Sequence, residues 1–473
     1  MSRSITPLFC DARLCLLGTV LMSALTGYGC SSEPGMENDT STLTLTSVTP
    51  ASGRNSMPTN ITLTGTGFRA GATVTVKGAA CTNVSVVSPT QISCTAPAQP
   101  ATCGTEAVVV TNSNSKSVTA KLFSYRPASP AFSPAVKLMG NGTSSYRIAT
   151  GDFNGDGKLD IATANSSNVT VYTNINIGGV VFSNGQDFPA GSTPVGLGIG
   201  DLNNDKKLDM VVGNSGSGNI SVLVGNGMGG FAAPANTSIS NTPGAVVLGD
   251  VNQDRNIDIL VANYNGARVS VFTGDGMGNL TQRPDVTVGS LPNFLALADL
   301  NKDGFLDLVT ANAGDNNISV RPGFGTGNFG VGMNISVGAQ PVSVELKDVN
   351  KDQNLDIIVT NESGNSVSVL LGNGSLGFNA AAGSPISLNA SVSGLKVVDL
   401  DGDGALDIVT TVTDSTITVL TGNGTGAFAR VLTPIATADK TFEVLVEDLN
   451  GDGILDLAYT QASNASVSFG ICN

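Results

Sequence analysis

The sequence predicts an all-β protein, a seven-bladed β-propeller preceded by a small β-sandwich. Three observations point to this fold class. An acidic nine-residue segment recurs seven times at a nearly fixed spacing, short apolar runs alternate with turn residues, and no long amphipathic helical pattern interrupts them. Glycine is abundant, at 58 of 473 residues, as expected for short strands that are joined by tight turns.

Residues 1–29 have the pattern of a signal peptide. Arg3 and Arg13 precede an apolar run over residues 14–25, which is too short to span a bilayer. The sequence Gly-Tyr-Gly-Cys at 27–30 resembles a lipoprotein processing site with Cys30 as the lipidated residue, although Gly27 replaces the usual leucine. An ordinary secretory signal is the alternative. We therefore expect an exported protein, either an outer-membrane or cell-surface lipoprotein or a secreted one, that meets the membrane only through a lipid anchor.

Two regions with different composition follow the signal. Residues 30–42 are polar and aperiodic, which predicts a flexible tether. Residues 43–126 alternate Val, Ile, Leu and Thr with Gly and Pro, and this is the size and rhythm of a β-sandwich. The stretches SVTPASG, ITLTGTGF, VTVKGAACTNV, QISCTAPA and VVVTNSNS resemble the IPT/TIG family of immunoglobulin-like domains.

Four cysteines lie beyond the tether. The IPT/TIG resemblance implies a disulfide between Cys81 and Cys94, and an oxidising compartment permits one. The sequence does not decide whether Cys103 pairs with Cys472. The short Pro-rich stretch PASP at 127–130 then leads into the last and largest region.

Residues 130–473 repeat one unit, in which an apolar strand leads into the pattern D-x-[ND]-x-D-x-x-x-D and a second apolar strand. Consecutive loops begin 49 residues apart, except for one interval of 51. A period near 49 residues suits four short antiparallel strands per blade. The predicted loops begin at Asp152, Asp201, Asp250, Asp299, Asp348, Asp399 and Asp448.

The two ends of this region predict how the ring closes. The seventh unit stops after its third strand, whereas the region starts with an orphan strand-like piece at 132–138. We expect this piece to complete the blade built by residues 442–472, because closure removes an exposed sheet edge. The segments GDFNGDGKLDI, ADLNKDGFLDL, VDLDGDGALDI and EDLNGDGILDL resemble the FG-GAP/VCBS repeat family, the propeller type of integrin α-subunits.

The acidic loops have the composition of calcium sites. Calcium takes six to eight oxygen ligands, and side chains at positions 1, 3, 5 and 9 with the carbonyl at position 7 supply them. We therefore expect up to seven Ca²⁺ ions, one per blade. The predicted ligands are Asp152, Asn154, Asp156, Lys158 and Asp160; Asp201, Asn203, Asp205, Lys207 and Asp209; Asp250, Asn252, Asp254, Asn256 and Asp258; Asp299, Asn301, Asp303, Phe305 and Asp307; Asp348, Asn350, Asp352, Asn354 and Asp356; Asp399, Asp401, Asp403, Ala405 and Asp407; Asp448, Asn450, Asp452, Ile454 and Asp456.

Position 6 of the loop predicts differences in affinity. Four loops have glycine there, which permits the sharp turn, and three have Lys206, Arg255 and Gln353, which we expect to weaken binding. The loops hold 22 of the 37 acidic residues. Carboxylates packed this closely repel one another unless a cation lies between them. The alternative is that these aspartates only form Asx-type turns.

Composition narrows the function classes. The formal charge of −14 argues against nucleic acid and anionic lipid as partners, and the chain has no histidine, the commonest general base. We therefore expect that the protein is not an enzyme and has no catalytic residues. We expect a cell-surface binding, adhesion or scaffold protein whose ligand is a protein or a glycan. A lectin-like propeller is the second alternative. A polysaccharide-active enzyme that uses a carboxylate pair among Glu345, Glu443 and Glu447 is the third.

Overall fold

The computed structural model describes residues 42–140, 144–177, 180–239, 241–430 and 434–472. Within these ranges every regular element is a β-strand, which confirms the all-β prediction. No helix in this part of the chain is both long and apolar enough to cross a membrane. Cys30, the predicted signal peptide and nearly all of the predicted tether lie outside the described residues.

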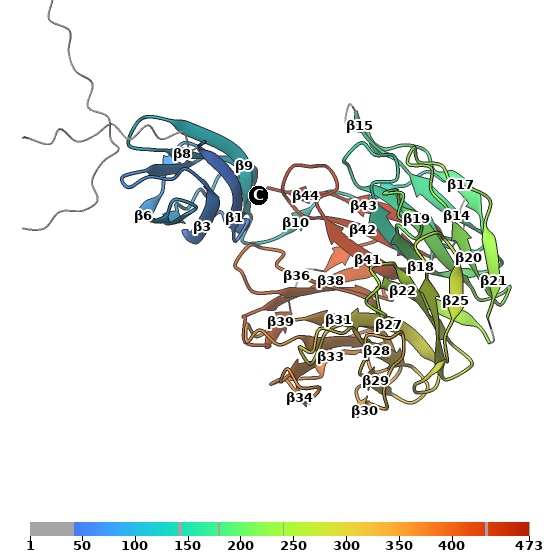
Figure 1. Cartoon of the computed structure of the whole chain (residues 1–473). Helices are drawn as coiled ribbons and strands as arrows, with labels where there is room; N and C mark the ends of the chain where they lie inside the picture. Colours follow the sequence, from blue (N-terminus) through green and yellow to red (C-terminus); the bar gives the residue numbers. More distant parts are fainter. Residues whose placement is uncertain (1–41, 141–143, 178–179, 240, 431–433, 473) are drawn as a thin grey trace, which may run out of the picture. The chain divides into compact units, whose positions relative to one another are not determined.

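The N-terminal domain is a sandwich of two sheets, drawn in blue to cyan in Figure 1. Alternate side chains of both sheets meet in one core that includes Leu63, Val74, Val108 and Phe123. The first sheet has the order β1 (Thr44–Thr49), β3 (Thr59–Thr66), β7 (Gln91–Ala96), β6 (Thr82–Ser88). The second has the order β2 (Ser52–Arg54), β9 (Ser117–Arg126), β8 (Gly104–Thr111), β4 (Thr73–Val76), β5 (Ala79–Ala80).

The cysteines of the sandwich correct one prediction. Cys81 and Cys94 are free, buried thiols that contact each other in the core, whereas Cys103 forms the disulfide, with Cys472. The predicted pair therefore does not form in this structure. Both residues pack with the aliphatic core as small apolar side chains. The disulfide joins residues 369 positions apart and links the sandwich to the end of the chain.

The rest of the described chain forms seven antiparallel sheets of four or five strands, one for each acidic loop, and two smaller two-stranded sheets; we call the seven larger sheets blades one to seven. Blades one to three comprise β12 (Arg147–Gly151), β13 (Asp160–Ala164), β14 (Asn168–Tyr172) and β17 (Gln186–Pro189); β18 (Pro194–Gly200), β19 (Asp209–Asn214), β20 (Asn219–Leu223) and β21 (Ala235–Ser238); β22 (Pro243–Gly249), β23 (Asp258–Asn263), β24 (Arg268–Gly274), β25 (Leu280–Gln282) and β26 (Val286–Thr287).

Blades four to seven repeat this order. They comprise β27 (Pro292–Ala298), β28 (Asp307–Asn312), β29 (Asn317–Arg321) and β30 (Met333–Ser336); β31 (Pro341–Lys347), β32 (Asp356–Asn361), β33 (Ser366–Gly372), β34 (Phe378–Ala380) and β35 (Ile386–Ser387); β36 (Val392–Val398), β37 (Asp407–Val412), β38 (Thr416–Gly422), β39 (Phe428–Arg430) and β40 (Ile435–Ala436); β41 (Thr441–Glu447), β42 (Asp456–Gln461), β43 (Ala465–Ser468) and β11 (Val136–Lys137). A hairpin of β15 (Asn174–Ile177) and β16 (Val180–Phe182) extends from blade one.

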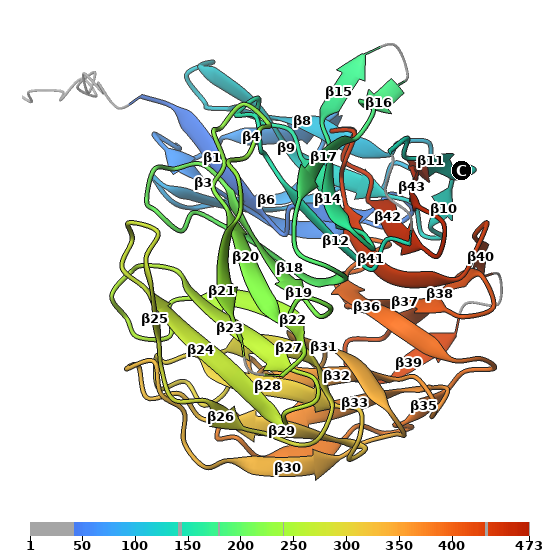
Figure 2. The same cartoon turned by 90° about the vertical axis from the view of Figure 1, so that its right-hand side faces the viewer.

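The first strands of the blades contact one another in sequence, and the first strand of blade seven contacts that of blade one (Figure 2). Blade seven takes its outer strand from the start of the repeat region, because β11 pairs with β43. A two-residue strand, β10 (Ala131–Phe132), pairs with β44 (Gly470–Ile471) beside it. This agrees with the expected closure, which leaves neither end of the repeat region as an unpaired edge.

The cores lie between neighbouring blades. Every residue of the second strands is buried, from β13 to β42, as expected for strands covered on both faces. Five phenylalanines that recur at one position of the repeat pack beside these cores. They are Phe182, Phe231, Phe329, Phe378 and Phe428.

Candidate metal centre: the acidic loops

Each acidic loop connects the first strand of its blade to the second, and two of its residues have a left-handed backbone. At position 6, Lys206, Arg255 and Gln353 have φ of 66°, 70° and 69° where other loops have glycine. These values agree with the sharp turn that glycine at this position predicted. Position 4 has the same conformation, which the sequence did not predict because this position is glycine in only three loops. The residues at position 4 are Gly155, Asn204, Gln253, Lys302, Lys351, Gly402 and Gly451.

This backbone turns the side-chain oxygens of positions 1, 3 and 5 into the loop. In loop one the Asp152 carboxylate accepts the N–H groups of Gly155, Asp156 and Gly157 at 2.7, 3.1 and 2.8 Å. Asn154 Oδ1 accepts the N–H of Asp156 at 2.9 Å, and Asp156 Oδ1 accepts that of Lys158 at 3.0 Å. The predicted ligands of positions 1, 3 and 5 therefore converge through bonds to their own loop.

The aspartate at position 9 has a different environment, because it is buried and holds the blade together. In loop four, Asp307 Oδ2 accepts the N–H of Leu300 and Oδ1 that of Gly323, both at 2.9 Å. The same two bonds recur in every loop, so this carboxylate ties the loop to the end of the third strand. The aspartates are Asp160, Asp209, Asp258, Asp307, Asp356, Asp407 and Asp456.

Burial raises the pKa of all seven of these carboxyl groups, and the carboxylates of positions 5 and 1 add repulsion in most loops. The pKa of Asp258 rises to about 6, and those of Asp407 and Asp456 rise to about 7. Keeping these carboxyl groups ionised therefore costs free energy, and a nearby cation would lower that cost.

Six of the loops offer a donor set that fits calcium. Their positions 1, 3 and 5 supply carboxylate and amide oxygens, which are hard donors, and each bonded carboxylate oxygen keeps a second lone pair. Position 5 also has a local partner in each of them. In loops three, four, five and seven the partner is the position-3 amide, at 2.8 to 3.0 Å. In loops one and two it is the ammonium of Lys158 or Lys207, at 3.3 Å.

Loop six differs from the others. Within the described ranges it alone brings three carboxylates, those of Asp399, Asp401 and Asp403, within 4.8 Å of one another. Two arginines of the sandwich domain contact oxygens of this loop. The Arg54 guanidinium contacts Asp401 Oδ2 and lies 3.0 Å from Asp403 Oδ2, and Arg126 donates to the carbonyl oxygen of Asp399. Neither arginine could be predicted from the local sequence pattern, because both lie more than 270 residues from the loop.

A second set of buried polar residues marks the opposite end of the second strand. Asn312 Nδ2 donates to Asn317 Oδ1 and Ser319 Oγ, both at 2.8 Å, and Asn214 makes the equivalent bonds in blade two. These amides join the second strand to the third. These asparagines recur with the repeat period, which is a signal in the sequence that could have indicated their role.

The three glutamates considered for catalysis all have structural partners. Glu345 Oε1 accepts the Lys396 ammonium at 2.8 Å, and Glu443 Oε2 accepts the N–H of Ile148 at 2.8 Å. Glu447 Oε2 accepts the Thr150 hydroxyl at 2.9 Å. They lie on the first strands of blades five and seven, where they connect neighbouring blades.

A cavity of about 390 Å³ lies beside the first strands of blades one to four. Its lining includes Arg147, Tyr264, Asn265 and Asn293. The Arg147 guanidinium is held in place, because its Nε donates to the carbonyl oxygen of Val195 at 3.0 Å and its central carbon lies 5.1 Å from the Phe294 ring centroid.

Comparison with known proteins agrees with this architecture. The FG-GAP-like repeat model matches residues 152–212, 201–261, 250–310, 299–359, 348–410 and 399–459, and the IPT/TIG domain model matches residues 43–125. No curated protein matches the chain in sequence.

Solved structures of low sequence identity share the fold. BBS1N, in a crystal structure with ARL6DN soaked with mercury, has a TM-score of 0.53 at 12% identity, over 72% of this chain and 96% of that chain. The RRP9 WD40 repeats have a TM-score of 0.50 at 11% identity, over 72% of this chain and 99% of that chain. At these identities the likeness is one of fold, and it agrees with the propeller prediction. The chain belongs to the FG-GAP-like repeat family and carries an IPT/TIG domain ahead of its repeats.

Proposed function

We propose that this protein is an exported, calcium-stabilised propeller that serves as a cell-surface binding, adhesion or scaffold module. The observation that carries the proposal is the acidic loop, which recurs once per blade and in which the position-1 carboxylate accepts a hydrogen bond from the position-6 N–H group in all seven cases. Bound calcium would supply charge compensation and cross-linking of the loop oxygens, with positions 1, 3 and 5 as its side-chain ligands. The position-9 aspartates serve mainly as acceptors of buried N–H groups.

The structural role of the ions follows from where the loops lie. Each loop joins the two innermost strands of a blade, and its second residue, such as Leu300 or Val349, is buried in the core between blades. Fixing a loop therefore fixes the packing between two blades. An ion that binds only the folded chain adds about 2.7 kcal/mol per site at a hundredfold excess over Kd.

A chelator experiment tests this function. Thermal unfolding followed by circular dichroism in calcium should show a higher Tm than in excess EDTA, and magnesium should restore less of the difference, because its preferred octahedral shell is smaller. Identical Tm values with and without chelator would reject the calcium proposal.

We propose that the ligand is a protein, with a glycan as the second candidate. The 390 Å³ cavity is the observation that favours a glycan. Arg147, Tyr264, Asn265 and Asn293 combine a guanidinium group, an aromatic ring and two asparagines, which suit a polar ligand such as a sugar. Glycan-array binding that is lost in Arg147→Gln and kept in Arg268→Gln, a matched change on β24, would favour the lectin reading. Binding only to proteins would favour the adhesion reading.

We propose a non-enzymatic role and an exported location on separate grounds. The engaged state of Glu345, Glu443 and Glu447 supports a non-enzymatic role, because a general acid must be available to its substrate. Turnover of a polysaccharide panel that falls in Glu443→Gln would contradict it. For the location, metabolic labelling with palmitate should mark the wild type and not Cys30→Ser. Unlabelled but secreted protein would indicate the ordinary signal instead.

A further inference from the structure

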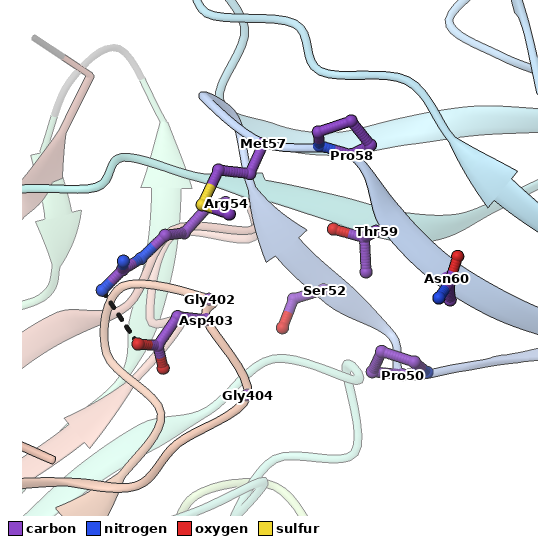
Figure 3. A pocket seen from close by; sticks show the side chains of 10 residues that line it. All are labelled: Pro50, Ser52, Arg54, Met57, Pro58, Thr59, Asn60, Gly402, Asp403 and Gly404. Atoms are coloured by element: carbon purple, nitrogen blue, oxygen red, sulfur yellow. Dashed lines mark ion pairs between the residues drawn. The ribbon is translucent and has the colours of Figure 1, made fainter. Parts of the chain in front are cut away.

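The sandwich contacts loop six through two arginines that approach from different strands. Arg54 is the last residue of β2, and its guanidinium points at the carboxylate of Asp403, 3.0 Å away (Figure 3). The same terminal nitrogen contacts Asp401 Oδ2. Arg126, the last residue of β9, donates to the carbonyl oxygen of Asp399. Together the two guanidinium groups carry the two positive charges that a divalent ion would carry.

The sequence of loop six matches this arrangement. Position 3 is aspartate here and asparagine in the other six loops, and Asp401 is only 1% exposed. A buried carboxylate needs a partner of opposite charge, and Arg54 is the partner that Asp401 has. The other oxygens of Asp401 and Asp403 accept N–H groups of their own loop at 3.1 and 2.7 Å. In loop six the Arg54 guanidinium thus contacts the carboxylates of both positions 3 and 5, whereas in the other loops the partner of position 5 is the position-3 amide or a lysine of the same loop.

Further contacts hold the sandwich at this place. A Cβ on Gly402 would lie 2.9 Å from the carbonyl carbon of Gly53, so the loop and the strand approach as closely as glycine allows. In loop seven, the carbonyl oxygen of Asp452 accepts the N–H of Thr105 at 3.0 Å. Cys103, two residues before Thr105, forms a disulfide with Cys472 beside blade seven. Arg54 therefore reaches loop six because the sandwich domain packs against it.

We propose that the Arg54 guanidinium is the resident cation of loop six, and that this loop holds the sandwich instead of a calcium ion. The inference rests on the proposed function for its statement that the other loops bind calcium, so that the chain takes at most six ions. The same nine-residue pattern then has two uses, which are ion binding in six blades and domain docking in one.

Calcium stoichiometry tests the proposal. Equilibrium dialysis with radioactive calcium should give one more ion per chain for Arg54→Gln than for the wild type, because the vacated carboxylates become available. Lys121→Gln, a matched charge removal at an exposed position of β9, should bind as the wild type does. Asp403→Asn should leave the wild-type stoichiometry unchanged. Loss of one ion in Asp403→Asn, or equal stoichiometry in Arg54→Gln and the wild type, would overturn the proposal.

A second measurement does not depend on calcium. In EDTA, the shifts in Tm of Arg54→Gln and Asp403→Asn should be non-additive, with the double variant shifted much less than the sum of the two single shifts. Additive shifts would overturn the docking role. A chain that binds no calcium would contradict the proposed function alone, and this cycle would then decide whether Arg54 is the cation of loop six.

Discussion

Loops four and six share the same turn but differ at position 3, which is asparagine in loop four and aspartate in loop six, and in what surrounds them. Both have glycine at position 6, with φ of 87° and 80°, and in both the position-9 aspartate accepts the same two backbone N–H groups. In loop four the position-5 carboxylate accepts the amide of Asn301, whereas in loop six it faces Arg54 from the sandwich. The repeat therefore determines the backbone of the loop, while its neighbour determines which cation it meets.

The largest expected effect lies where the two loops are alike. Asp307→Ala and Asp407→Ala should each destabilise the chain by about 4 kcal/mol, because each leaves two buried N–H groups without an acceptor at about 1–3 kcal/mol apiece. Urea unfolding in EDTA measures both losses. Nearly equal losses would show that position 9 supports the blade without calcium. A loss that appears only when calcium is present would indicate a ligand role instead.

Position 5 should separate the two loops. At a hundredfold excess of calcium over Kd, Asp303→Asn should remove about 2.7 kcal/mol of the stabilisation that calcium adds. Asp403→Asn should leave that increment intact, because Arg54 and not calcium faces this carboxylate. The quantity to compare is the difference in unfolding free energy with and without calcium. Equal losses of the increment in both variants would remove the distinction between the loops.

Position 4 offers a comparison between loops six and seven. Gly402 and Gly451 both have φ of 77°, so alanine should cost about 1–2 kcal/mol at either place through backbone strain. Nothing lies within 4 Å of a Cβ on Gly451, whereas one on Gly402 meets Gly53. Only Gly402→Ala should also increase protease cleavage in the linker at 127–130. Equal cleavage in the two variants would argue against close docking at loop six.

The smallest effect concerns position 6. Lys206→Gly in loop two should tighten calcium binding at that loop by about twofold, equivalent to about 0.4 kcal/mol, because it relieves a φ of 66° and removes a positive charge. Gly304→Lys should have the opposite effect in loop four. Terbium luminescence titrations can compare the two variants with the wild type. An unchanged affinity in both would show that position 6 does not tune the site.

The repeat could be recognised in the sequence because the same strand–loop–strand unit recurs seven times. Seven copies of the pattern identified the loops, the buried second strands and the outer strand supplied by residues 132–138, since each of these depends on alternation and spacing within a blade. The pairing of Cys81 with Cys94 was wrong for this structure, because it was inferred from a resemblance and not from geometry. The disulfide that forms, Cys103–Cys472, joins two segments whose proximity no local pattern encodes.

The sequence alone determined the all-β class, the order of sandwich and propeller, and the residues that turn oxygens into each loop, because strand alternation and turn chemistry act over a few residues. Only the tertiary structure decided that Asp401 meets Arg54, that position-9 carboxylates are buried N–H acceptors, and that Cys103 pairs with Cys472. Those contacts join residues 7 to 369 positions apart, and packing between strands, blades and domains brings them together.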